Sequence, residues 1–77
     1  MKIDLATQRY KEGIFSSATV RRSPNNLNEW FIMLVDNDNL SFIIADSDDS
    51  IITSTDLESI FDTLKKIGFS SAEVVFK

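Results

Sequence analysis

The feature that most constrains the fold is a strand candidate at residues 29–36 that is apolar on both faces. Side chains alternate between the two faces of a strand. Here the two sets are Trp30, Ile32 and Leu34 on one face and Phe31, Met33 and Val35 on the other. A second strand candidate, residues 40–46, repeats the pattern. Strands that are apolar on both faces are buried on both faces, so both sides of the sheet need a cover.

The chain is short for that task. Its 77 residues fit one small domain, residues 1–77, and one helix covers only one face of a sheet. The N-terminal segment is one candidate for the second face, although it holds few apolar residues. The alternatives are a second copy of the chain or another protein partner. The residues expected at such an interface are Phe31, Met33, Val35 and Ile43.

The chain contains no cysteine and no histidine. A disulfide within it is therefore excluded, and the two common soft ligands of zinc are missing. Small domains often depend on such a staple or on a partner subunit, so this composition also favours self-association or binding to another protein. The lack of cysteine fits a reducing compartment.

The clearest predicted helix spans residues 56–67. Thr55 and Glu58 have the spacing of a capping box at its start, and Gly68 is the kind of left-handed residue that ends many helices. Five apolar residues recur between them at helical spacing: Leu57, Ile60, Phe61, Leu64 and Ile67. This stripe predicts that the helix packs against a sheet.

Four segments are predicted as strands, and residues 51–53 as a short extension that leads into the helix. The four are residues 14–22, 29–36, 40–46 and 72–76. The Asn- and Asp-rich turn at residues 36–39 predicts a hairpin. Together these elements predict an α+β fold of order β-β-β-α-β. It is an antiparallel sheet of three to four strands packed by one long helix, with a short final strand.

The first thirteen residues fit two patterns. Ile3, Leu5 and Thr7 alternate as in a strand, which would pair with residues 14–22 through a turn at residues 11–13. Residues 4–12 also fit a short polar helix that ends at Gly13. Of the two, we predict the strand.

Charge is unevenly distributed along the chain, whose net charge is −4. Residues 1–22 hold five basic and two acidic side chains, whereas residues 23–77 hold three basic and ten acidic ones. A negative net charge disfavours general nucleic-acid binding. The basic third still suggests a local phosphate-binding site, whose candidate residues are Arg9, Lys11, Arg21 and Arg22. The competing interpretation is that these charges balance the acidic loops.

Aspartates cluster in two predicted loops, at residues 36–39 and 46–50. Asp-rich loops can supply the oxygen ligands of calcium. A calcium loop that starts at Asp46 would need glycine at its sixth position and glutamate at its twelfth, where the chain has Ile51 and Leu57. We therefore expect solvated turns, without a metal or another cofactor.

Catalysis is not expected from this chain. Its serines lack the histidine that usually activates a serine nucleophile, and Gly13 and Gly68 are too few for a phosphate-binding loop. The longest apolar run, residues 30–35, is far shorter than the roughly 20 residues of a membrane helix. The first ten residues also lack an apolar run of signal-peptide length. We expect a cytoplasmic, non-enzymatic protein that does not enter a membrane.

These features together resemble small proteins of bacterial plasmids and other mobile elements that are associated with replication or partition. The shared pattern covers roughly residues 18–76. It consists of Trp30 in a strand, the turn at residues 36–39, the helix start Ser54-Thr55-Asp56-Leu57, Leu64, the helix end Ile67-Gly68-Phe69, and Val74. Where those proteins carry a basic, arginine-containing stretch before the helix, this chain has Asp46-Ser47-Asp48-Asp49-Ser50. The resemblance therefore carries over no functional residue.

The sequence thus predicts a non-enzymatic accessory or protein-interaction domain, of bacterial or mobile-element origin, that self-associates. The alternative is a nucleic-acid-binding module that uses the basic N-terminal third.

Overall fold

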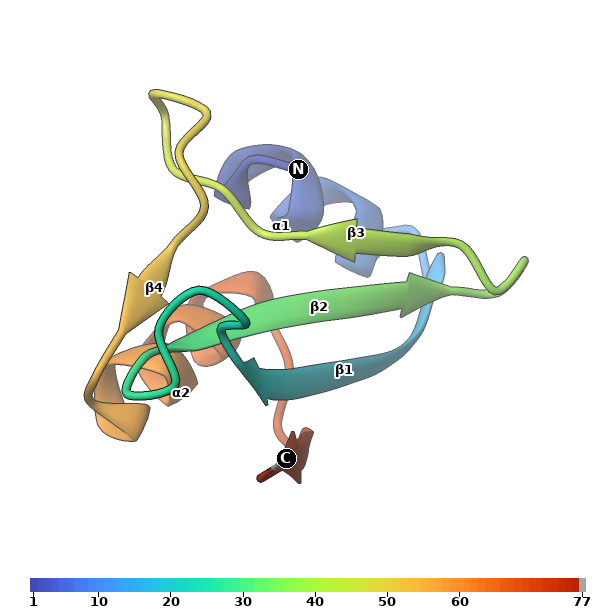
Figure 1. Ribbon diagram of the computed structural model, residues 1–77. Coiled ribbons are helices and arrows are strands. Elements are labelled where there is room, and N and C mark those ends of the chain that lie inside the picture. The colour runs from blue at the N-terminus through green and yellow to red at the C-terminus, as the bar shows by residue number, and fades with distance from the viewer. Residues whose placement is uncertain (77) are drawn as a thin grey trace.

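Residues 1–76 are described by a computed structural model, in which a mixed sheet carries two helices on one side (Figure 1). The chain runs through seven elements in order: α1 (Ile3–Lys11), β1 (Phe15–Arg22), β2 (Trp30–Asp36), β3 (Ser41–Ile43), β4 (Thr53–Ser54), α2 (Leu57–Ile67) and β5 (Glu73–Val75). The α+β class is confirmed, and so is the helix near residues 56–67. The strand predicted at residues 40–46 is shorter, because only Ser41–Ile43 pairs as a strand. Within the described residues the fold has five strands and two helices, where three to four strands and one long helix were predicted. No helix within residues 1–76 has the length and apolar character to cross a bilayer.

The sheet is mixed, whereas the sequence predicted an antiparallel one. Its order is β3-β2-β1-β5, and β4 pairs with β2 beside β3. The antiparallel hairpin of β1 and β2 sets Ala18 opposite Leu34 and Val20 opposite Ile32. β5 instead runs parallel to β1. The reason lies in the connection, because β4 and β5 point the same way and α2 joins them as a crossover helix. Parallel strands need such a crossover.

The prediction of a strand in residues 1–13 was wrong, and the helical alternative is what forms. α1 buries Ala6 completely against the core, while Leu5 of the supposed strand pattern stays 41% exposed. The edge of β1 that this strand would have occupied is taken by β5. Gly13, with φ of +74°, turns the chain from α1 into β1.

The start of α2 lies one residue later than the capping-box spacing implied. Asp56 is the N-cap, and its Oδ1 accepts a hydrogen bond of 3.0 Å from the backbone N–H of Glu58. Ser59 donates its hydroxyl to Oδ2 of the same carboxylate at 3.2 Å. The helix ends as predicted at Gly68, whose N–H donates to the carbonyl of Leu64.

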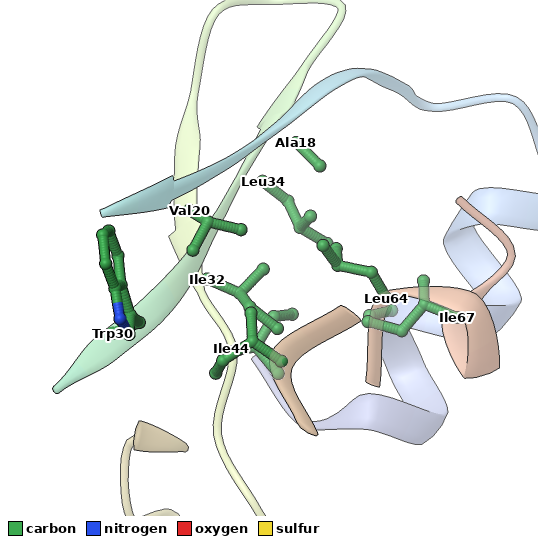
Figure 2. Close-up of a cluster of buried hydrophobic side chains, with 10 residues drawn as sticks. Ala18, Val20, Trp30, Ile32, Leu34, Ile44, Leu64 and Ile67 are labelled. Atoms are coloured by element: carbon green, nitrogen blue, oxygen red, sulfur yellow. The ribbon is translucent and has the colours of Figure 1, made fainter. Parts of the chain in front are cut away.

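The core fills one side of the sheet only. Val20, Ile32 and Leu34 are fully buried or nearly so, and they pack with side chains of both helices. Figure 2 shows the strand side chains directed toward Leu64 and Ile67 of α2. Because α1 joins the same cluster through Ala6, the N-terminal segment does not cover the second face. That face of the sheet faces away from both helices.

Candidate interaction surface

The uncovered side of the sheet, here called the open face, is defined by strand register. Residues paired across neighbouring strands share a face, and Met33 pairs with both Thr19 and Ile43. The same register adds the other members. The open face consists of Ser17, Thr19, Arg21, Phe31, Met33, Val35, Ser41, Ile43, Thr53, Glu73 and Val75.

The centre of the open face is apolar. Phe31, Met33 and Val35 are only partly buried, and within residues 1–76 they lie outside the core cluster and the side chains packed against it. Ile43 is 39% exposed beside Met33. The four residues that the sequence suggested for an interface therefore lie together, while their role in binding stays a prediction.

Hydroxyl side chains surround this apolar centre. Ser17 and Thr19 of β1 lie opposite Val35 and Met33, Ser41 of β3 lies beside Val35, and Thr53 lies beside Phe31. An apolar centre with a polar rim is the usual anatomy of a protein interface. The open face has that arrangement on a rigid sheet.

A hollow of about 390 Å³ lies at one end of the apolar centre. Its apolar lining comes from Phe31, Ile43 and Ile51, and the loop at residues 23–26 forms a wall. Glu29 closes the polar side, because it accepts hydrogen bonds from Thr53 at 2.7 Å and from Asn26 at 3.0 Å. Ile51, which is 54% exposed, was not among the interface residues expected from the sequence. The sequence did offer a signal for it, since Ile51 begins the short extension predicted at residues 51–53.

The four basic candidates for nucleic-acid binding do not form one surface. Arg9 and Lys11 lie in the last turn of α1. Arg21 and Arg22 lie at the far end of β1, about 20 Å from its first residue at the rise of a strand. Neighbouring residues of a strand also face opposite sides, so these two arginines diverge.

Arg22 is bound within the protein itself. Its guanidinium lies 4.7 Å from the centre of the Trp30 ring. Its Nε donates to the carbonyl of Phe76 at 3.0 Å, and Nη1 donates to the carbonyl of Leu27 at 2.7 Å. These contacts tie the loop after β1 and the backbone at Phe76 to the sheet, so this arginine has a structural role.

The two acidic loops have the same conformation. In each loop, Oδ1 of the first aspartate accepts hydrogen bonds from the backbone N–H groups two and four residues later. Asp36 accepts from Asp38 and Leu40, each at 2.9 Å. Asp46 accepts from Asp48 at 2.9 Å and Ser50 at 3.1 Å. Both carboxylates thus close turns, and residues 1–76 hold no cluster of three acidic side chains suited to a metal ion.

The chain was compared with known proteins at three levels. No family model, no curated protein and no solved structure matches it.

Proposed function

We propose that this protein is a non-enzymatic accessory domain that binds a protein partner, a second copy or a different chain, through the open face. The observation that carries the proposal is the apolar stripe of Phe31, Met33, Val35 and Ile43 on a sheet side that neither helix covers. An accessory role of this kind also agrees with the resemblance to mobile-element proteins.

The driving force is the burial of apolar surface. Complete burial of one large apolar side chain contributes about 1.5–3 kcal/mol. The stripe has four large apolar side chains that are each partly exposed, so burying their exposed parts would contribute a share of this energy from each. Since the stripe lies on strands rather than loops, it is presented in one conformation and needs little ordering on binding.

The test is site-specific photo-crosslinking in the cells that make the protein. A photoreactive amino acid replaces Ile43 on the open face, and in a matched control it replaces Asp62 on the exposed side of α2. We expect defined crosslinked products from position 43 and none from position 62. Mass spectrometry of the products then identifies the partner. Equal crosslinking at both positions, or none at position 43, would contradict the proposal.

The nucleic-acid alternative needs Arg9, Lys11, Arg21 and Arg22 to act on one ligand. Their separation on α1 and on two faces of β1 disfavours this. Titration with single- and double-stranded DNA at low salt tests it, because phosphate contacts weaken as salt rises. We expect no salt-dependent binding. Binding at low salt that weakens as salt rises would instead support the nucleic-acid alternative.

A further inference from the structure

We propose that the partner on the open face is a second copy of this chain. The two copies bind face to face about a two-fold axis, with Arg21 of each copy paired with Glu73 of the other. This inference rests on the proposed function, since it requires the open face to bind protein.

The charges of the open face are self-complementary. A two-fold interface brings one patch against the same patch, so it must carry both signs of charge to avoid repulsion. Among residues 1–76, the charged side chains of this surface are Arg21, Glu73 and, at its end, Glu29. Both carboxylate oxygens of Glu29 already accept hydrogen bonds. Within residues 1–76, neither Arg21 nor Glu73 takes part in an ion pair, which leaves one cation and one anion for the partner.

Register fixes where the symmetry axis must lie. Glu73 pairs with Thr19, two residues from Arg21, on the strand next to it. When two faces meet about a two-fold axis, each point of one face meets its mirror image across that axis. With strands about 4.8 Å apart and a rise of about 3.3 Å per residue, the line that exchanges Arg21 and Glu73 crosses the face diagonally and passes close to Met33.

The same axis also matches three of the four apolar side chains of the stripe to one another. On this idealised face it sets Met33 against Met33 of the other copy, and it sets Val35 against Ile43 of the other copy. An axis chosen for the charges alone thus superposes three of the four apolar side chains of the stripe on apolar side chains, whereas Phe31 falls between Ser17 and Glu73 of the other copy. Strands of the two copies then cross at a steep angle, which is one of the two common ways in which sheets pack.

Pairing along the sheet edges is a weaker alternative. The outer edge of β3 is already in use, because the Met1 ammonium group donates to the carbonyl of Ile43 and Ala45 N–H donates to the carbonyl of Met1, both at 2.7 Å. The other edge, β5, is only three residues long. The open face is therefore the larger surface for self-association.

Sedimentation equilibrium over a wide concentration range tests the dimer, and charge exchange tests its axis. Arg21→Glu and Glu73→Arg are each expected to weaken the dimer about tenfold or more, because each places like charges opposite each other twice. A mixture of the two variants restores both pairs, so we expect it to form a heterodimer of near wild-type affinity. Glu58→Arg, on the exposed side of α2, serves as the matched control and leaves the affinity unchanged.

The outcomes separate this inference from the proposed function. A wild-type protein that stays monomeric overturns the dimer, while crosslinks from position 43 to a different protein would keep the proposed function. If Met33→Glu leaves the dimer as strong as wild type, and circular dichroism shows that the variant is folded, the open face is not the dimer interface. A mixture that fails to restore affinity overturns the Arg21–Glu73 pairing.

Discussion

Gly68 meets two constraints at the residue scale. Its φ of +133° is a conformation that other residues rarely adopt. A Cβ at this position would lie 2.5 Å from Cδ1 of Tyr10, the ring that packs edge-on against Phe69 at 4.7 Å between centroids. The glycine thus allows α1 to approach the end of α2.

We expect Gly68→Ala to lower the free energy of unfolding by about 2–4 kcal/mol, from backbone strain and from the clash with Tyr10. Gly13→Ala is the control, because Gly13 also has positive φ but a methyl group added there would meet nothing within 4 Å. It should cost only about 1–2 kcal/mol. Urea unfolding followed by circular dichroism measures both, and equal losses would show that the contact with Tyr10 carries no weight.

The two aspartate loops share one hydrogen-bond pattern but differ in the exposure of the accepting carboxylate. Asp36 is 7% exposed and Asp46 is partly exposed, although each carboxylate accepts the same two hydrogen bonds. We expect Asp36→Ala to cost about 2 kcal/mol and Asp46→Ala less than about 1 kcal/mol, because water replaces the lost acceptor only at the exposed loop. Asp36→Asn, which keeps an oxygen acceptor, should stay close to wild type. Equal costs for the two alanine variants in thermal unfolding would contradict this.

The sequence predicted the turn at residues 36–39 because Asn and Asp are typical of tight turns. It did not predict that residues 46–50 repeat the same hydrogen bonds, since the identity of the bonded groups depends on the backbone path. Ile51 was missed for a similar reason. Its exposure next to Phe31 and Ile43 arises only when β3 and β4 share one edge of β2.

At the scale of elements, the structure shows that Asp56 is the N-cap of α2, whereas the sequence pattern indicated Thr55. Asp56→Ala should destabilise the protein by about 1 kcal/mol, because it removes the acceptor of the Glu58 N–H. Thr55→Ala should change stability by less than about 0.5 kcal/mol, since Thr55 is exposed and is not the N-cap. Denaturant midpoints at matched protein concentration test the pair, and the reverse order of losses would place the cap at Thr55.

α2 was predictable and α1 was not, for a physical reason. The stripe of α2 consists of large apolar residues, so its helical period is clear in the sequence. α1 buries only Ala6, a small residue whose contribution depends on how closely α1 approaches its neighbours. The alternation of Ile3, Leu5 and Thr7 competed with this weak signal, and tertiary packing decided the outcome.

The parallel pairing of β5 with β1 also could not be predicted from the sequence. Three residues of strand carry almost no information on their partner, and their direction follows from the crossover through α2. The mixed sheet is thus a consequence of chain path rather than of local pattern.

At the scale of the whole molecule, the sequence indicated correctly that the strands are apolar on both faces. It could not indicate that both helices would cover the same face, because that choice depends on α1 forming at all. The apolar stripe of the open face was therefore predictable from the sequence, and its role in binding stays a prediction. The placement of Arg21 relative to Glu73 was not predictable, because it requires the register of β5.

If the open face joins two copies, stability must depend on protein concentration. A dimer that unfolds to two separate chains is stabilised by mass action. Well above the dissociation constant, a tenfold rise in concentration adds about 0.7 kcal/mol per chain, which raises Tm by about 3–5 °C in a domain of this size. Met33→Glu should remove this dependence, since it places two carboxylates at the axis. Scanning calorimetry across a hundredfold concentration range tests both, and a constant Tm for the wild-type protein would mean that single chains unfold.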